Sequence, residues 1–403
     1  MIPNSSSDLF EHYGLKPVIN VAGTMTYLGA SMVVSRAREA SEAIQKHFVH
    51  IDALQAAASR VIARVTGAEA GFVSACSAAG IVQSIAGCMT GGNLAKIEKL
   101  PETDGLKNEV VVQRGHLINY GAPVDQAIRQ SGARIAPVGT AALSHSFHLK
   151  DAINEQTTAA LYVVSHHVVQ EGQIPLTEFI CICRERNVPV IVDMASEYDL
   201  VTPIKLGADL VLYSSHKFLG GPTAGIVAGK RRYVRDAYLQ HRGIGRPMKV
   251  GKEGIIGAMA ALEAWEERDH SAVRKLEKRR VDFFIEKLGN IDGLDLEIHP
   301  DWTGNPIERV KVKVNPDRAG LYAWELAERL ADGQPSIQVR CDLIEWGYFF
   351  LDPCNLKQGQ EKIVSERIAE EVRNALTAGD GRAFDYSEYR QRKHQSALQW
   401  LDT

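Results

Sequence analysis

Short apolar runs alternate with longer segments of helical periodicity through the middle of the chain. Continuous runs rich in valine and isoleucine are typical of strands buried on both faces, as in a parallel sheet. The predicted strands are residues 70–75, 108–113, 134–139, 158–165, 188–196 and 208–215. The predicted helices between them are residues 78–89, 121–133 and 176–187. This alternation predicts an α/β domain with a mostly parallel sheet that is covered by helices on both faces.

The last third of the chain has a different pattern. Helical periodicity from Lys252 to Lys287, with a break near residues 268–271, predicts two consecutive helices. Strands of a half-exposed antiparallel sheet are predicted at residues 307–315, 336–343 and 347–354, with helices at 319–333 and 360–379. We therefore expect three parts, which are an N-terminal arm that joins the small domain (residues 1–50), a large domain (51–265) and a small α+β domain (266–403).

The composition is that of an ordinary globular protein. Of the 403 residues, 45% are hydrophobic and 24% are charged, and the formal net charge is −3. A balance so near neutrality does not favour electrostatic binding to nucleic acid or to a membrane. The N-terminus resembles no secretory signal, and no apolar run reaches the ~18 residues of a membrane span. We expect a cytoplasmic protein whose 6 cysteines stay reduced and hold no metal.

Three segments stand where predicted strands end, which is where parallel sheets bind their ligands. Residues 74–80 (SACSAAG) are small. They either let a helix N-terminus hold an anion or allow tight packing of the helix on the sheet. Asp193 ends an apolar strand, where a carboxylate either caps a turn or meets a cation. Residues 213–225 (YSSHKFLGGPTAG) place a lysine between polar residues and two glycines.

The lysine of the third segment, Lys217, follows Asp193 by 24 residues. With one short helix and one strand between them, that spacing brings both residues to the same edge of a parallel sheet. A buried amine has a lowered pKa and becomes a nucleophile for carbonyl groups, and a carboxylate nearby can pair with a pyridinium nitrogen. The alternative is a surface lysine that extends from a loop. That alternative explains less well the polar and glycine residues around Lys217.

These segments resemble a known class of enzymes. "DMAS" and "YSSHKFLGGPTAG" are similar to the aspartate and Schiff-base lysine segments of fold-type I pyridoxal-phosphate (PLP) enzymes, and S-x-H-K-x-x-G-G-P resembles the class V aminotransferases and cysteine desulfurases. Most of the chain resembles the selenocysteine synthase-like branch, particularly the D-glucosaminate-6-phosphate ammonia-lyase-like proteins. Residues 13–31, 47–80, 217–230 and 245–265 carry this resemblance. It implies a large domain with a seven-stranded-type, mostly parallel sheet and a small C-terminal domain.

The resemblance also implies roles for individual residues. Lys217 would form the Schiff base with PLP and move protons at the substrate Cα, and Asp193 would keep the pyridine nitrogen protonated. His116 would stack on the cofactor ring, its alternative being a hydrogen-bonded loop histidine. Arg340 would hold the substrate carboxylate with its planar fork, its alternative being an exposed strand arginine. The residues expected to contact the cofactor phosphate are Cys76, Ser77, Ala78, Ala79, Ser214 and His216.

The implied activity is a PLP-dependent lyase. It would act on a β-hydroxy or β-substituted amino acid by α,β-elimination and release ammonia and a 2-oxo acid. The acid for the departing hydroxyl stays open among Tyr120, His166, His167 and Lys252. Aldolase, racemase, aminotransferase and sulfur- or selenium-transfer reactions use the same scaffold and remain alternatives. So does a catalytically silent binding module, against which the intact lysine and aspartate argue.

The resemblance extends to partners. A seryl-tRNA substrate is disfavoured, because no basic N-terminal domain precedes the matching segments and because His216 stands where the synthase has an acidic residue. A small-molecule amino acid is the expected substrate. Fold-type I sites usually form at a subunit interface, so a homodimer or larger homo-oligomer is expected. In it, residues 245–254 would reach the neighbouring subunit's cofactor phosphate.

Overall fold

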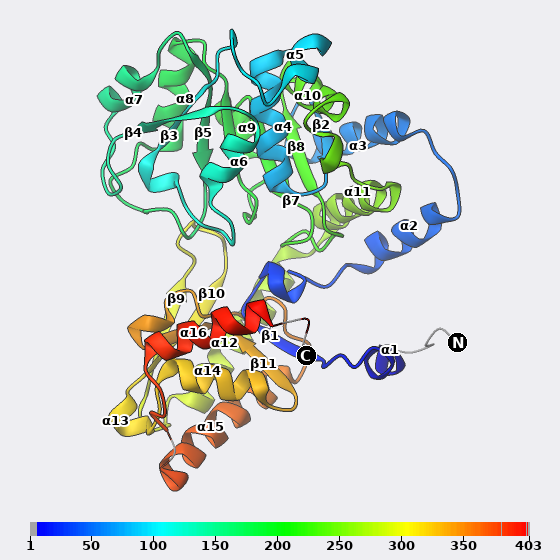
Figure 1. Ribbon diagram of the computed structural model, residues 1–403. Helices are drawn as coiled ribbons and strands as arrows, with labels where there is room; N and C mark the ends of the chain where they lie inside the picture. Colours follow the sequence, from blue (N-terminus) through cyan, green and yellow to red (C-terminus); the bar gives the residue numbers. More distant parts are fainter. Residues whose placement is uncertain (1–5, 380, 400, 402–403) are drawn as a thin grey trace. The chain divides into compact units, whose positions relative to one another are not determined.

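The computed structural model describes residues 6–379, 381–399 and 401 of the chain (Figure 1). It forms two compact units. The larger unit runs from Gly29 to Arg268, and the smaller unit combines the described residues up to Leu28 with those from Asp269 onward. Residues 29–50, expected as part of the N-terminal arm, thus cluster with the larger unit.

The larger unit alternates strands with helices in the order expected of an α/β domain. Its helices are α2 (Ser35–Gln45), α3 (Ile51–Thr66), α4 (Ser77–Thr90), α5 (Leu94–Lys99), η2 (Arg114–His116), α6 (Val124–Gln130), α7 (Ser146–Ala152), α8 (Leu176–Glu185), α9 (Thr202–Leu206), α10 (Arg231–Tyr238), η3 (Leu239–Arg242), η4 (Arg246–Met248) and α11 (Lys252–Glu267). Its strands are β2 (Ala70–Ser74), β3 (Glu109–Gln113), β4 (Arg134–Val138), β5 (Thr157–Val163), β6 (Val190–Asp193), β7 (Leu210–Ser214) and β8 (Gly225–Gly229).

Seven strands form one sheet in the order β2-β8-β7-β6-β5-β3-β4. The pairs from β4 through β7 are parallel, and β8 lies antiparallel to both β7 and β2. The predicted fold class, a mostly parallel seven-stranded sheet, is confirmed. The sequence reading missed β8, because its five residues (GIVAG) are bounded by glycines and carry only three apolar side chains.

Helices cover both faces of this sheet, because alternate strand residues point to opposite sides. Val110 and Val112 of β3 belong to a core cluster with residues of α4, α6 and α10. Val111, between them, belongs to another cluster with residues of α3, α8 and α11. Figure 1 shows α4 and α6 on the near side of the sheet. The continuous apolar strands seen in the sequence are the consequence of this two-sided burial.

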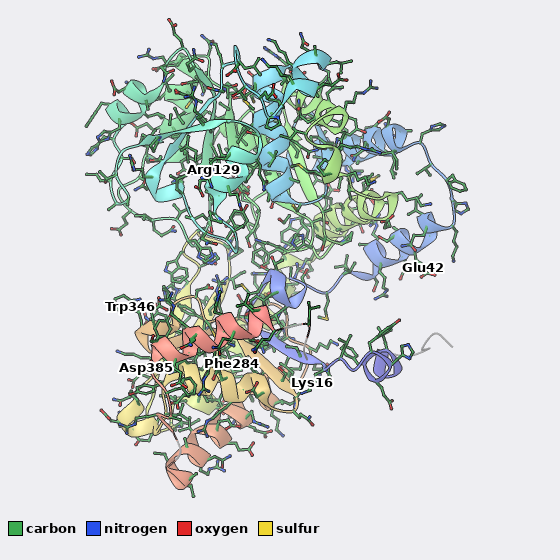
Figure 2. All side chains as sticks on the ribbon, in the orientation of Figure 1. Lys16, Glu42, Arg129, Phe284, Trp346 and Asp385 are labelled. Atoms are coloured by element: carbon green, nitrogen blue, oxygen red, sulfur yellow. The ribbon has the colours of Figure 1, made fainter. Side chains whose placement is uncertain are left out.

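The smaller unit contains several helices and two small sheets. Its elements are α1 (Ser6–His12), β1 (Val18–Val21), η1 (Thr26–Leu28), α12 (His270–Leu288), β9 (Leu294–Pro300), β10 (Glu308–Val314), α13 (Pro316–Ala319), α14 (Ala323–Asp332), β11 (Ser336–Val339), η5 (Ile344–Trp346), β12 (Tyr348–Leu351), α15 (Gln360–Ala378) and α16 (Tyr386–Leu398). Phe284 of α12 is fully buried in its core, whereas Trp346 is largely exposed (Figure 2).

One pairing prediction for this unit was only partly right. Residues 336–343 were expected in the antiparallel sheet, but β11 pairs in parallel with β1 near the N-terminus, and the segment meets the antiparallel sheet at the isolated bridge between Arg340 and Phe350. The antiparallel sheet has the order β12-β10-β9, and its strand β9 was not predicted. The break predicted near residue 268 separates α11 from α12 as expected. Among the described residues, no helix combines the length and apolar character needed to cross a membrane.

Candidate active site

The predicted site residues of the larger unit gather where its parallel strands end. Asp193 is the last residue of β6, and its backbone neighbours in register are Val163 of β5 and Leu212 of β7. Ser214 ends β7 and is in register with Gly225 of β8. These residues share one edge of the sheet because parallel strands carry their carboxyl ends to the same side.

Asp193 is a buried carboxylate, only 7% exposed. Its Oδ1 accepts a hydrogen bond from the Ala195 backbone N–H at 3.1 Å. Burial raises the pKa of Asp193 to about 6, and the ammonium of Lys217 opposes this shift. The two residues therefore lie within electrostatic reach of each other, as the 24-residue spacing predicted.

His216 precedes the lysine and is 8% exposed. Burial lowers the pKa of His216, and the ammonium of Lys217 lowers it further, so the imidazole is neutral at pH 7. Within the part of the chain that the structure describes, its Nδ1 is buried without a hydrogen-bond partner, and so is Ser215 Oγ. A buried polar atom without a partner is costly. A polar ligand at this edge of the sheet would satisfy such atoms.

The small-residue segment forms the N-terminus of α4, a 14-residue helix. Cys76 is the N-cap, and its Sγ accepts a hydrogen bond from the Ala79 N–H at 3.4 Å. Ser77 Oγ lies 3.0 Å from Ser214 Oγ, which joins this turn to the end of β7. The first N–H groups of a helix have no partner within the helix, so together with two hydroxyls they offer several donors to an anion.

Gly225 is a part of this site that sequence reasoning missed. A Cβ at this position would lie 2.3 Å from the carbonyl carbon of Cys76, so only glycine lets the Cys76–Ser77 turn cross the end of β8 so closely. Its signal was present in the "GGPTAG" segment, where a single glycine precedes an apolar run. Because that run was not predicted as a strand, there was no reason to expect Gly225 beside the Cys76–Ser77 turn.

His116 follows β3 and lies inside the protein, 1% exposed. Its Nδ1 accepts a hydrogen bond from the Val163 N–H at 3.1 Å, and the ring of Tyr162 meets it edge-on at 4.5 Å. Burial lowers the pKa of His116 to about 4. The histidine is therefore a neutral ring fixed at the end of β5, beside the strand that carries Asp193. Its stacking on a cofactor stays a prediction.

The candidates for the proton donor differ in position. Burial raises the pKa of Tyr120 to about 12, and the charges of Asp193 and Cys76 add to this, so its phenol lies within electrostatic reach of the site. Lys252 Nζ instead donates to the carbonyls of Gln45 and His47 at the end of α2. The rings of His166 and His167 lie 3.8 Å apart in the segment after β5.

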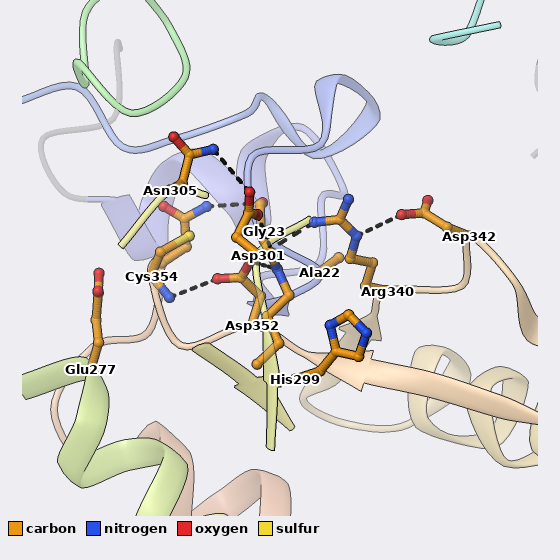
Figure 3. Close-up of polar contacts among 12 residues, drawn as sticks. Ala22, Gly23, Glu277, His299, Asp301, Asn305, Arg340, Asp342, Asp352 and Cys354 are labelled. Atoms are coloured by element: carbon orange, nitrogen blue, oxygen red, sulfur yellow. Dashed lines mark hydrogen bonds and ion pairs between the residues drawn. The ribbon is translucent and has the colours of Figure 1, made fainter. Parts of the chain in front are cut away.

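Arg340 belongs to the smaller unit, directly after β11, and is 4% exposed. Its Nε donates to Asp342 Oδ2 at 2.6 Å, and its Nη1 lies 4.0 Å from Asp352 (Figure 3). The side chain of Arg309 bridges Asp301 and Asp352, with 2.6 Å to each. Arg340 thus lies in a buried ionic cluster, which sequence reasoning did not foresee. Its role toward a substrate carboxylate stays a prediction.

Comparisons with known proteins agree with this geometry. The family model of SelA, L-seryl-tRNA selenium transferase, matches residues 18–281. D-glucosaminate-6-phosphate ammonia lyase of Salmonella typhimurium is 37% identical over 375 residues, which is 93% of this chain and 100% of the relative. The 5'-C-glycyluridine monooxygenase-decarboxylase of a Streptomyces species is 35% identical over 365 residues, covering 90% of this chain and 91% of that protein.

A solved structure of D-glucosaminate-6-phosphate ammonia-lyase superposes with a TM-score of 0.82 at 36% identity, covering 93% of this chain and 100% of that chain. The fold and the site define a fold-type I PLP-dependent enzyme. Within that class, the chain belongs to the SelA family. The resemblance inferred from the sequence is confirmed, and PLP is the cofactor expected of the family.

The described residues fit this cofactor. The close approach of the Cys76–Ser77 turn to Gly225 and the free N–H groups at the start of α4 suit a phosphate group. Asp193 is buried beside a cation, as an aspartate facing a pyridinium nitrogen must be. The site therefore has a donor set for the phosphate and a carboxylate for the ring, both near one amine.

Proposed function

We propose that this protein is a PLP-dependent lyase that deaminates a β-hydroxy or β-substituted amino acid by α,β-elimination. The observation that carries the proposal is the position of the buried Asp193 at the end of β6, at the carboxyl edge of the sheet and within electrostatic reach of Lys217. It is supported by the 37% identity to an ammonia lyase over nearly the whole chain. A β-hydroxy substrate would lose one water when the hydroxyl leaves Cβ and take up one water when the C–N bond at Cα is hydrolysed. The net products would be ammonia and a 2-oxo acid.

The residues of the site suggest how the work is divided. When bound, PLP supplies an electron sink that acidifies the substrate Cα–H. The amine of Lys217 would take that proton, and Asp193 would keep the ring nitrogen protonated. The phosphate would rest on the N-terminus of α4 with Ser77, Ser214 and His216. Tyr120 is our candidate for the acid at the departing hydroxyl, because its phenol is protonated at neutral pH and lies within electrostatic reach of Asp193, although its raised pKa makes it a weaker acid than a free phenol.

The test is a substrate panel assayed for several products in parallel. Purified protein with PLP is incubated with β-hydroxy amino acids of both hands and with D-glucosaminate 6-phosphate, a compound named by its relative. Ammonia and 2-oxo acid should form in equal amounts, and Lys217→Ala should abolish both. Lys205→Ala, on the exposed side of α9, is the matched control and should keep the activity.

Other products would identify other reactions. Aldehyde release would mean retro-aldol cleavage, and transfer of the amino group to an oxo acid would mean an aminotransferase. The Streptomyces relative is named a monooxygenase-decarboxylase, so carbon dioxide release with oxygen uptake is measured as a separate arm. Any of these without ammonia would overturn the lyase proposal.

We also propose that the protein is a cytoplasmic homodimer acting on a small molecule and not on seryl-tRNA. All 6 cysteines are free thiols, as a reducing compartment would keep them.

In the proposed dimer, residues 245–254 would contact the neighbouring subunit's cofactor phosphate. In support of this, Arg242, Arg246 and Lys249 line a cavity of about 450 Å³. Arg246→Ala should weaken cofactor retention at an unchanged elution volume, whereas a monomeric wild-type protein on gel filtration would contradict the dimer.

A further inference from the structure

The turn that carries the lysine, residues 215–221, is closed by its own backbone. The Gly221 N–H donates to Ser215 O at 2.8 Å, and the Gly220 N–H donates to Lys217 O at 3.1 Å. We call this segment the lysine turn. Its carbonyl groups still have lone pairs to satisfy, because each accepts two hydrogen bonds.

A second segment, residues 29–34, holds the lysine turn from outside. The Ser31 hydroxyl lies 2.7 Å from His216 O and 2.7 Å from Lys217 O. With one proton, it serves these two carbonyls as a shared donor. The Val34 N–H donates to Gly220 O at 2.8 Å. We call residues 29–34 the clasp segment. It is separated from the lysine turn by about 185 residues of chain, and no local sequence pattern predicts the contact.

Gly220 lets the clasp segment approach the lysine turn, and Gly221 lets the turn close on itself. Gly220 has a φ of +66°, and a Cβ there would lie 2.8 Å from Val34 Cγ1. A Cβ at Gly221 would lie 2.0 Å from Ser215 Oγ. The clasp itself is held tightly, because Ala30 keeps a φ of +62° while only 1% exposed. A non-glycine residue adopts this conformation only where its surroundings enforce it.

The side chain of Arg268 contacts the next carbonyl of the lysine turn, that of Phe218. Arg268 Nη1 lies 3.5 Å from Phe218 O, and its guanidinium lies 5.3 Å from the ring centroid of Trp265. The Phe218 ring packs on Tyr198 at 4.3 Å, and Tyr198 packs on Trp265 at 5.0 Å. The carbonyls of three consecutive residues, with the lysine in the middle, are therefore held by Ser31 and Arg268.

Ser31 and Arg268 lie at the two chain ends of the larger unit. The chain enters the unit at Gly29 and leaves it at Arg268. We propose that Ser31 and Arg268 are positioning residues for Lys217, which fix the backbone of the lysine turn at the points where the chain joins the two units. The inference rests on the proposed function only in taking Lys217 as the amine that reacts with PLP.

The experiment measures the lysine turn directly. Amide hydrogen exchange is followed in the cofactor-free full-length protein for peptides that cover residues 215–221. Ser31→Ala removes one hydrogen bond, so these amides should exchange about tenfold faster, whereas peptides of β5 should be unchanged. Arg268→Met should give a smaller increase, of about twofold, because its bond is longer. Ser41→Ala is the matched control, since Ser41 Oγ also donates to a backbone carbonyl, that of Glu253 at 2.9 Å.

A second readout follows the reaction of the lysine with PLP. On adding PLP to the cofactor-free protein, the absorbance of the covalently bound cofactor should appear about tenfold more slowly in Ser31→Ala, and Ser31→Thr should restore the rate. Unchanged exchange in the lysine turn of Ser31→Ala, or equal acceleration in Ser41→Ala, overturns the inference. If wild-type Lys217 does not react with PLP at all, the proposed function fails instead, while the exchange data still decide the role of Ser31.

Discussion

His116 and Asp193 should give the cofactor-free protein two opposing dependences of stability on pH. The pKa of His116 is lowered from 6.5 to about 4, so the folded state resists protonation that the unfolded state accepts. Its contribution to stability is present above pH 6.5 and is lost as the pH falls through 4. The pKa of Asp193 is raised from 3.8 to about 6, so its contribution is present below pH 3.8 and is lost as the pH rises through 6.

The magnitudes follow from linkage between protonation and folding. When the pH falls from 7.5 to 5, His116 should lower the free energy of unfolding by about 2 kcal/mol, and Asp193 should raise it by about 1 kcal/mol. Asp193→Asn removes the second contribution, so this variant should lose about 1 kcal/mol more than wild type over this range. His116→Asn removes the first and should lose about 2 kcal/mol less, and the asparagine Oδ1 can still accept from the Val163 N–H.

The assay is urea unfolding of the cofactor-free chain at pH 7.5 and 5, with the variants compared by their midpoints at equal slope. Asp151→Asn, on the exposed surface of α7, controls for the loss of a carboxylate and should follow wild type. The reasoning would be refuted if both variants kept the wild-type dependence, or if both departed from it in the same direction.

Three further outcomes are expected. Gly225→Ala should destabilise the protein by about 1–3 kcal/mol and lower cofactor retention, because its Cβ overlaps the Cys76 backbone. Gly92→Ala, with nothing nearer than 3.8 Å, should do neither. Asp352→Ala should cost about 3–5 kcal/mol in urea unfolding, since it leaves buried Arg309 short of a partner. Asp292→Ala, at the exposed ion pair with Arg318, should cost at most about 1 kcal/mol. Tyr120→Phe should lower ammonia release about a hundredfold at unchanged thermal stability, and equal activity would exclude the phenol as the acid.

The position of the candidate site was predictable because strand ends are visible in a sequence. The apolar runs that end at Asp193 and Ser214 marked two neighbouring strand ends, and the spacing to Lys217 placed an amine beside a carboxylate. The fold class followed from the same runs. By contrast, Arg340 carried no sign that Asp342 and Asp352 would surround it.

The sequence by itself determined the alternation of most strands and helices in the larger unit, because hydrophobic period is a local property of a chain. Its motifs carried the resemblance to the family and the prediction that Lys217 is the reactive amine. Only the tertiary structure decided that β11 pairs with β1, that Gly225 lies under the Cys76 turn and that Ser31 holds the lysine turn. It also decided that burial raises the pKa of Asp193 and lowers that of His116. These features depend on burial and on contacts between residues far apart in the chain, so no local pattern encodes them.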